Sequence, residues 1–422
     1  MASEWKEIPL GEAITLQRGF DLPTQERKVG NTPVVSSSGI SGYHDEARVK
    51  APGVVTGRYG TIGEVFLVRE DFWPLNTTLY VKDFKGNDER FISYLLRTLN
   101  FLSHNDKSSV PGVNRNHLHL IPVSMPKSVE EQRAIAHILG TLDDKIELNR
   151  RRNETLEAMA RALFQSWFVD FDPVRAKAAV RREHPRWTDA EVCRAALPTL
   201  APEIAALFPD SFENSALGDI PIGWQIERFG EVCERIFSGG TPSTTVSDYW
   251  HGGLPWLSSG ETRAKFVIST EKSISQKGVE NSSTRFARTG STVIASAGQG
   301  NTRGQTSLLM LDTYINQSVV ALIPNQSKST DLHLFFDLER RYDEFRRVSD
   351  GHSSRGSLTT KLLADLMTVL PPLPVVKAFD TLVEPMVQKN TTSLREIETL
   401  AALRDTLLPK LISGEISAIG RP

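Results

Sequence analysis

Apolar residues recur at alternating steps of three and four along two long stretches of the chain, 244 residues apart. Such a seam, sustained over about five heptads, is typical of a long helix that pairs with another helix. We expect the helix-pairing positions to be Ile135, Ile138, Leu142, Leu156, Met159 and Leu163 in the first stretch, and Phe379, Leu382, Met386, Leu400, Leu403 and Leu407 in the second.

The ends of both helices are marked by local signals. The first helix is predicted over residues 129–168, with Ser128 as its N-cap and Glu131 completing a capping box. The second is predicted to begin after a Pro-rich segment at 371–374 and to end near Gly414, with two internal prolines as points where it can bend. At 1.5 Å per residue, forty residues make a helix of roughly 60 Å.

Both seams turn polar at their centre, and at the same offset. The polar residues are Lys145, Asn149 and Arg152 in the first copy and Lys389, Ser393 and Glu396 in the second. Polar seam residues fix the register of a helix pair at some cost in stability. The shared polar centre therefore favours pairing of the two helices with each other. A coil that only joins separate chains is the alternative.

The stretch before each long helix has a different pattern. It is rich in Gly, Ser, Thr and Asn, and short β-branched or aromatic runs alternate with turns, which predicts short strands. The predicted strands are 53–59, 64–68, 78–81, 292–297 and 317–323, and amphipathic helices are predicted at 90–102 and 331–348. The fold class is therefore α+β, with two globular domains that are each followed by a long helix.

The chain is a tandem duplication. Trp5 and the sequence Leu-Gly-Glu at 10–12 match Trp224 and Phe-Gly-Glu at 229–231, and residues 120–126 match 366–372. The growing offset places about 27 extra residues in the second copy, within 239–289. We predict a first globular domain at 1–127, a first spacer helix at 128–172, a linker with one or two short helices at 173–215, a second globular domain at 216–372, and a second spacer helix with a C-terminal tail at 373–422.

Charge argues against a protein that binds DNA through net charge alone. Lys and Arg number 49 against 51 Asp and Glu, and the two globular domains hold 15 basic with 14 acidic and 16 basic with 16 acidic side chains. Because Lys and Arg contacts to phosphate dominate such binding, attraction to nucleic acid has to come from local patches or from partners.

Cysteine content and apolar runs bear on the compartment. The only two cysteines, Cys193 and Cys233, lie in no zinc-like cluster and cannot form a disulfide framework. The N-terminus lacks the pattern of a secretory signal, and no run of 18 apolar residues occurs. We expect a cytoplasmic protein with no membrane association and no structural metal.

Signatures of catalysis are missing from the sequence. No Gly-Lys dipeptide is present, so a P-loop lysine is absent, and the glycines from Gly298 to Gly304 miss the dinucleotide spacing by one position. The Asn- or Asp-Pro-Pro-aromatic motif of amino-methyltransferases does not occur, because the only Pro-Pro is followed by Leu373. We therefore expect a chain that is not an enzyme and needs no cofactor.

Polar loops with cations occur in both globular domains and are the candidate DNA-contacting segments. Arg pairs with guanine, Asn or Gln with adenine, and Ser or Thr with phosphate, while glycines allow close backbone approach. Residues 281–311 hold three arginines and no acid. The ordinary interpretation of each loop alone is a solvated turn. The candidates are Arg58, Tyr59, Thr61, Arg115 and Asn116 in the first domain, and Arg285, Arg288, Gln299, Asn301, Arg303, Ser354 and Arg355 in the second.

Three segments resemble a known family. Residues 128–174 (SVEEQRAIAHILGTLDDKIELNRRRNETLEAMARALFQSWFVDFDPV) resemble the first conserved helical region of type I restriction-modification specificity subunits. Residues 403–416 (LRDTLLPKLISGEI) resemble the end of the second conserved region, and 207–224 (LFPDSFENSALGDIPIGW) the entry to the second target-recognition domain. With the order of domains and helices, the resemblance covers nearly the whole chain.

The resemblance implies a specificity subunit without catalytic activity. In that family two target-recognition domains each read one half of a split site on double-stranded DNA, and two helices that pair as an antiparallel coiled coil hold them at a set distance. Two methyltransferase subunits that use S-adenosylmethionine dock on the helices and methylate adenine, and restriction subunits join them. A non-catalytic protein-protein scaffold with two binding domains on a coiled coil is the alternative, and an enzyme of unknown type is a second one.

Overall fold

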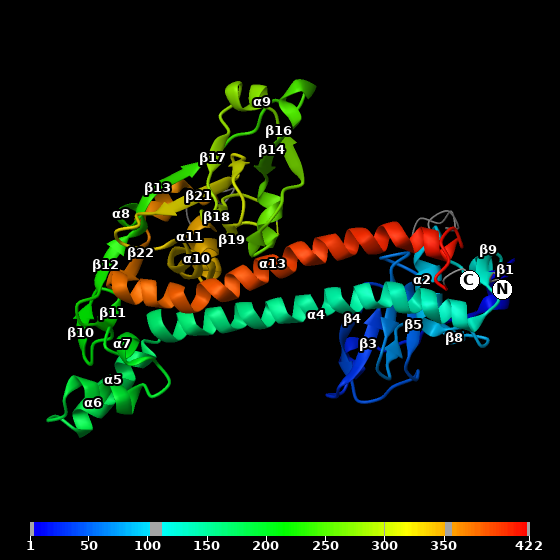
Figure 1. Cartoon of the computed structure of the whole chain (residues 1–422), viewed down its shortest axis with the longest axis horizontal. Coiled ribbons are helices and arrows are strands. Elements are labelled where there is room, and N and C mark those ends of the chain that lie inside the picture. Colours follow the sequence, from blue (N-terminus) through cyan, green and yellow to red (C-terminus); the bar gives the residue numbers. More distant parts are fainter. Residues whose placement is uncertain (1–3, 102–111, 299, 351–356, 420–422) are drawn as a thin grey trace. The chain divides into compact units, whose positions relative to one another are not determined.

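The computed structural model describes residues 4–101, 112–298, 300–350 and 357–419, and the chain forms two compact units (Figure 1). Unit 1 contains residues 1–148 and 396–422, and unit 2 contains residues 149–395. Each unit holds one globular domain and part of both long helices, α4 (Val129–Phe168) and α13 (Leu373–Ile412). The α+β fold class is confirmed, and the helix ends lie where the local signals predict them.

Unit 1 builds its globular domain from short strands. In chain order the elements are β1 (Trp5–Pro9), α1 (Leu10–Ala13), β2 (Thr15–Arg18), η1 (Thr24–Glu26), β3 (Thr32–Ser36), β4 (Gly39–His44), β5 (Gly53–Gly57), β6 (Val65–Val68), β7 (Trp73–Pro74), β8 (Thr78–Asp83), α2 (Glu89–Arg97), α3 (Arg115–His119) and β9 (Pro122–Pro126). They form an antiparallel sheet β2-β8-β5-β6, a sheet β4-β3-β7 in which β3 and β7 are parallel, and the antiparallel pair β1-β9. β9 leads directly into α4.

The core of unit 1 joins the domain to the two helices. Phe91 and Leu95 of α2 are buried against the sheet, and the same cluster includes Ile135 and Leu139 of α4 and Leu411 of α13. Each fully buried side chain of this size contributes roughly 1.5–3 kcal/mol. Neither helix therefore has to leave its apolar seam in water, because the domain and the other helix cover it.

In unit 2, a segment of short helices and one strand pair follows the end of α4. Its elements are α5 (Asp172–Glu183), α6 (Asp189–Ala196), α7 (Pro202–Ala205), β10 (Phe212–Ser215) and β11 (Gly218–Pro221). The sequence predicted one or two short helices here and the structure has three. α6 starts at a capping box made by Thr188 and Glu191, in which each residue bonds to the backbone of the other.

The second globular domain completes unit 2. Its elements are β12 (Gln225–Arg228), α8 (Phe229–Val232), β13 (Cys233–Ser238), η3 (Ser247–Tyr249), β14 (Trp250–Leu257), η4 (Ser259–Arg263), β15 (Phe266–Val267), β16 (Lys272–Ile274), α9 (Gln276–Glu280), β17 (Arg285–Ala287), β18 (Thr292–Ala295), β19 (Thr306–Leu309), β20 (Thr313–Ile315), β21 (Val319–Pro324), α10 (Asp331–Glu339), α11 (Tyr342–Asp350), α12 (Thr360–Asp365) and β22 (Met367–Leu370). The stretch 331–348, expected as one helix, is split between α10 and α11.

The sheets of the two domains correspond strand by strand. β12 pairs with β22 as β1 pairs with β9, and each of these pairs ends at a long helix. The sheet β13-β21-β18-β19-β15 matches β2-β8-β5-β6 with one strand added, and β16-β14-β20-β17 matches β4-β3-β7 with one strand added. The added strands β15 and β17, with α9, lie within or beside the stretch to which the sequence assigns the extra residues.

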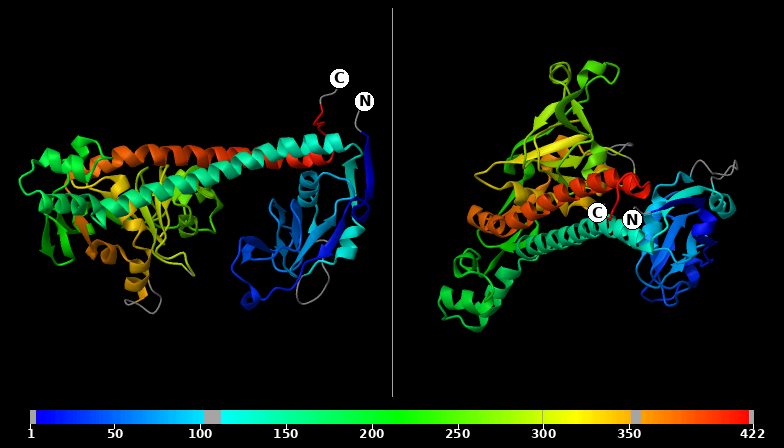
Figure 2. Two further views of the ribbon diagram at one scale, coloured as in Figure 1. Left: turned by 90° about the horizontal axis from the view of Figure 1, so that it is seen from below. Right: turned by 45° about the vertical axis from the view of Figure 1, so that its right-hand side comes forward.

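The long helices run antiparallel within each unit. In unit 2 the Phe164 ring lies 5.6 Å from the Phe379 ring, and Arg152 donates to Ser393 at 2.6 Å. In unit 1 the Lys145 ammonium lies 3.4 Å from the Glu396 carboxylate. The views in Figures 1 and 2 agree that α13 lies beside α4 in unit 2. The predicted polar centre is therefore the place where polar residues of the two helices meet.

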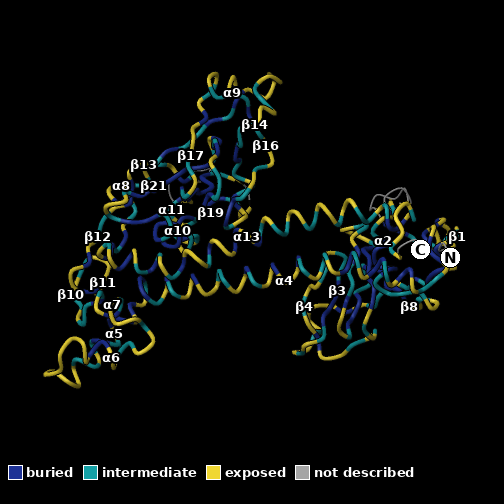
Figure 3. Tube along the Cα trace, viewed as in Figure 1, coloured by how far each residue is buried: buried dark blue, intermediate teal, exposed yellow. Residues whose placement is uncertain are grey.

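Two of the twelve expected seam residues are not covered. Met159 is 50% exposed and Leu403 is 46% exposed, whereas the neighbouring Ala160 is buried. The burial colouring in Figure 3 alternates along both helices, as expected when one face of each is covered. The expected burial was wrong at these two positions. Next to Met159, the covered face carries Ala160, which belongs to the same buried cluster as Phe164.

Candidate nucleic-acid interface

In the first domain, two loops meet at the end of β5. The backbone N–H of Arg58 donates to Thr77 at 2.9 Å, and the carbonyl of Arg58 accepts a hydrogen bond from Val113 at 3.0 Å. Val113 comes just before Asn114, the N-cap of α3. The bond from Val113 holds the loop after β5 against the segment that leads into α3, and the bond to Thr77 holds the same loop against the start of β8.

This loop pair presents a cation beside an exposed aromatic ring. The Arg58 guanidinium lies 4.6 Å from the centre of the Tyr59 ring, and Tyr59 is 37% exposed. Stacking of this kind keeps a guanidinium and a ring together at low cost, and both remain able to contact a ligand. Thr61, in the same loop, is exposed.

Two glycines shape this loop pair. A Cβ atom on Gly112 would lie 2.2 Å from the Tyr59 ring, and one on Gly57 would lie 1.8 Å from the carbonyl oxygen of Thr61. Both distances are far inside van der Waals contact. A larger residue at Gly112 would push the two loops apart, and one at Gly57 would disturb the turn from Gly57 to Thr61 within the first loop.

Arg115 and Asn116 begin α3 and are exposed. The Asn116 backbone N–H donates to the Asn114 side-chain oxygen at 2.9 Å, which caps the start of α3. Within the described part of the chain, no carboxylate pairs with Arg115 or Arg58. The first domain thus gathers all five of its candidate residues on one loop pair.

The second domain holds the corresponding loops in the same way. Leu358 donates from its backbone N–H to the carbonyl of Ser296 at 2.9 Å. Ser296 follows β18 as Arg58 follows β5, and Leu358 precedes Thr359, the N-cap of α12, as Val113 precedes the N-cap of α3. The same hydrogen bond therefore joins the same two loops in both domains.

The loop after β18 is anchored to α11. The carbonyl of Gly300 accepts from Arg346 at 2.8 Å, and the carbonyl of Asn301 accepts from the Tyr342 hydroxyl at 3.0 Å. Asn301, itself exposed, lines a cleft of about 360 Å³ together with Arg263. The candidates Gln299, Ser354 and Arg355 lie outside the described residues.

Two of the three arginines expected to form a free basic patch are already paired. Arg288 makes two hydrogen bonds to the carboxylate of Asp331, at 2.7 and 2.8 Å. Arg303 is 8% exposed and forms an ion pair with Asp350. The sequence window 281–311 lacks acids, but the fold brings acids to Arg288 and Arg303 from α10 and α11.

Arg285 is the remaining cation of that window. It is exposed on β17, and none of the described carboxylates pairs with it. The next residue, Phe286, is 47% exposed and lies 5.8 Å from the ring of Tyr314 on β20. Sequence reasoning missed Phe286, although an aromatic residue beside an arginine in a short strand is the signal that also marks Arg58 and Tyr59.

Other chemistry finds little support in the described ranges. There, no three His, Cys, Asp or Glu side chains gather as metal ligands would, and no helix has the length and apolar content that a bilayer crossing requires. Cys193 and Cys233 are buried free thiols. Burial raises the pKa of Cys233 to about 12, which keeps it protonated and unreactive at neutral pH.

Comparison with known proteins agrees with this arrangement. A family model described as the type I restriction modification DNA specificity domain matches residues 2–158 and 221–399. The type I restriction enzyme HindI specificity subunit of Haemophilus influenzae is 26% identical over 343 residues, which covers 75% of this chain and 73% of that protein. The MjaIX specificity subunit of Methanocaldococcus jannaschii is 23% identical over 355 residues, which covers 81% and 73%.

A solved structure shares the fold. The crystal structure of the type I restriction-modification S subunit from M. genitalium matches with a TM-score of 0.63 at 16% identity, over 97% of this chain and 96% of that one. Two similar domains, each followed by a long paired helix, define the class of specificity subunits. The family model covers more than half of the chain, and the protein belongs to the type I restriction-modification DNA specificity family.

Proposed function

We propose that this specificity subunit reads a bipartite site on double-stranded DNA, one half with each globular domain. The observation that supports it most directly is the duplicated loop pair, held by the Arg58–Val113 bond in one domain and the Ser296–Leu358 bond in the other. Each pair combines glycines, exposed polar side chains and nearby cations, which is the composition that base and phosphate contacts require.

Within each domain the candidate residues divide into two roles. Arg115 and Asn116 in the first domain, and Arg285 and Asn301 in the second, are exposed and available to DNA, and Arg58 is half-buried beside the exposed Tyr59. Arg288 and Arg303 hold the loops in place through their acid partners instead. Tyr59 and Phe286 supply apolar surface beside a cation, suited to sugar or base contact.

The chain supplies recognition, and its partners supply chemistry. Two methyltransferase subunits dock on the helix pair and methylate adenine, and restriction subunits join them for cleavage. This assignment is supported by membership of the family and by the names of the curated relatives. A balanced net charge agrees with it, because partner subunits then provide much of the phosphate contact.

Mapping methylated adenines tests the proposal. The chain is combined with the methyltransferase subunits of its own system and S-adenosylmethionine, and the methylated sites in genomic DNA are sequenced. We expect two short conserved words separated by a gap of fixed length. A single continuous word, or methylation without any sequence preference, would contradict reading by two domains.

Substitutions then assign each half-site. We expect Arg115→Ala to weaken specific binding by about 1–3 kcal/mol and to relax only one word, and Arg285→Ala to do the same for the other word. An equal loss on unrelated duplexes, with a smaller salt dependence, would show that the residue contacts phosphate. Binding to polypeptides with no affinity for duplex DNA at any salt concentration would favour the scaffold alternative.

A further inference from the structure

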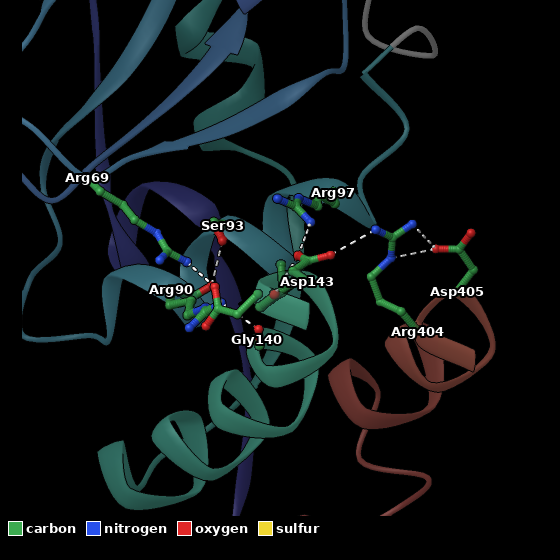
Figure 4. Close-up of polar contacts among 10 residues, drawn as sticks. Arg69, Arg90, Ser93, Arg97, Gly140, Asp143, Arg404 and Asp405 are labelled. Atoms are coloured by element: carbon green, nitrogen blue, oxygen red, sulfur yellow. Dashed lines mark hydrogen bonds and ion pairs between the residues drawn. The ribbon is translucent and has the colours of Figure 1, made fainter. Parts of the chain in front are cut away.

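Two adjacent acids on α4, Asp143 and Asp144, form ion pairs with four arginines of unit 1. Figure 4 shows Asp143 with these arginines. Asp143 and Asp144 lie in the part of α4 that runs past the first globular domain. The basic partners are Arg69, which follows β6, Arg90 and Arg97 on α2, and Arg404 on α13.

Asp143 contacts the first domain and the opposite helix with one carboxylate. Its Oδ2 accepts from the Tyr94 hydroxyl at 2.7 Å and from Arg97 at 3.0 Å, both on α2. Its Oδ1 accepts from Arg404 of α13 at 2.8 Å, and Arg404 is held in turn by Asp405 at 2.7 Å. A single side chain therefore connects the domain, α4 and α13.

Asp144 contacts the domain alone. It pairs with Arg69 and, at 2.9 Å, with Arg90. Arg90 also donates to the carbonyl of Gly140 at 2.7 Å, and a Cβ atom on Gly140 would lie 2.2 Å from its guanidinium carbon. The glycine lets α2 approach α4 closely enough for both acids to be reached.

The charged state of Asp143 follows from its partners. Burial on its own works to raise the pKa of this carboxyl, but hydrogen bonds from Arg404 and Tyr94 and the charge of Arg97 outweigh it and hold the pKa below the ordinary value. At neutral pH the carboxylate is ionised. Its hydrogen bonds from arginine are the charge-assisted kind, which are short and directional.

The second copy does not repeat this pair of acids on its long helix. The counterparts of Asp143 and Asp144, 244 residues later, are Val387 and Gln388. In unit 2, α10 meets the helices mainly through aromatic rings, with Phe336 5.8 Å from Phe379 and 6.1 Å from Phe164. The polar contacts there are separate, with Glu339 3.8 Å from Arg161 of α4 and Thr330 donating to Asp380 of α13 at 3.0 Å, and no polar side chain among the described residues joins all three elements as Asp143 does. Since duplication supplied the same framework twice, the acid pair is a specific feature of the first domain.

We propose that Asp143 is a positioning residue for DNA recognition: it fixes the orientation of the first domain on the helix pair and thereby sets the gap between the two half-sites. The inference rests on the proposed function. One added base pair moves a half-site by about 3.4 Å and turns it by roughly a tenth of a helical turn. If the first domain has one fixed orientation, it binds a DNA site with an altered gap poorly. If the domain can tilt, it can bind both half-sites of such a DNA.

The test uses the chain assembled with its methyltransferase subunits. Duplexes carry the two mapped half-sites with gaps from two base pairs shorter to two base pairs longer than the preferred one, and methylation rates are compared. We expect Asp143→Asn and Arg404→Ala each to raise methylation at gaps one base pair off by about tenfold relative to the preferred gap. The bases preferred within each half-site stay the same, and Arg404→Lys restores the narrow profile.

Lys145→Ala is the matched control. It removes the ion pair with Glu396 between the same two helices. Among the described residues, no hydrogen bond or ion pair joins Lys145 to the first domain, so we expect this variant to keep the narrow gap profile. If Asp143→Asn and Arg404→Ala also keep it while their melting temperatures fall, Asp143 is structural only and the inference is wrong. If wild-type protein methylates all gaps equally, the proposed two-half reading fails, and the inference fails with it.

Discussion

Asn153 and Asn390 exchange hydrogen bonds across the helix pair in unit 2. The side-chain amide of Asn153 donates to the main-chain carbonyl of Asn390 at 3.4 Å, and that of Asn390 donates to the carbonyl of Asn153 at 3.3 Å. Both residues are buried, and Asn390 also donates to Glu157 at 3.0 Å. A buried amide pair tolerates only the register in which each partner is present.

This pair predicts non-additive substitutions. Asn153→Leu removes the amide that donates to the Asn390 carbonyl, and Asn390→Leu removes the amide that donates to the Asn153 carbonyl, so each leaves one buried carbonyl without this donor and we expect each to lower the free energy of unfolding by about 1–3 kcal/mol. The double substitution replaces both amides by apolar groups and should cost less than the sum. Chemical denaturation of the four proteins in a double-mutant cycle measures the coupling. Strict additivity would show that the two amides do not depend on each other.

Phe379 and Met159 are both apolar residues of the long helices, but their substitution by alanine should have very different effects on stability. Phe379 is fully buried, with the rings of Phe164 and Phe168 5.6 and 5.2 Å away, so Phe379→Ala should cost about 3–5 kcal/mol. Met159→Ala changes an exposed side chain and should stay within about 0.5 kcal/mol. Unfolding curves of both variants decide the matter. A large loss in Met159→Ala would place Met159 back in the seam.

Substitution of Arg288 should affect thermal stability, and substitution of Arg285 should affect DNA binding. Arg288→Ala removes both hydrogen bonds to Asp331, and we expect a melting temperature several degrees lower. Arg285→Ala leaves the fold unchanged, because no described carboxylate pairs with Arg285, and should reduce DNA binding instead. Thermal melts together with binding titrations check the pair. Equal melting temperatures for both variants would speak against a structural role for Arg288.

Asp380 predicts a dependence of stability on pH. Burial raises its pKa to about 6, with Glu384 and Asp331 adding to the shift and a hydrogen bond from Thr330 opposing it. The folded state then holds the proton more tightly than the unfolded state, so stability falls as pH rises from about 4 to about 6 and stays lower above that range. Asp380→Asn keeps the Thr330 contact without the charge.

We expect Asp380→Asn to melt a few degrees higher than wild type at pH 7.5 and to lose this advantage at pH 4.5. Melting temperatures at half-unit pH steps give the measurement. Glu384→Gln is a useful comparison, since it removes one of the charges that raise the pKa of Asp380 and should shift the same transition to lower pH. A constant difference between Asp380→Asn and wild type across this range would contradict the raised pKa.

The sequence by itself determined the α+β class, the duplicated order of globular domain and long helix, and the ends of both long helices to within about two residues. Periodicity, the Ser128 cap and the flanking prolines act over a few residues, so they can be read locally, and the duplication repeats them. The loop pairs were also recognisable, because glycine and polar composition mark them in both copies.

Only the tertiary structure decided which charges are free and which face of a helix is covered. Arg288 and Arg303 meet acids that lie more than forty residues away, and Asp143 meets Arg404 across 261 residues. Such pairs leave no local pattern. The buried position is Ala160 and not the predicted Met159. Helical periodicity specifies only a broad apolar face of the helix, and side-chain volumes in the packed core decide which residue of that face is buried.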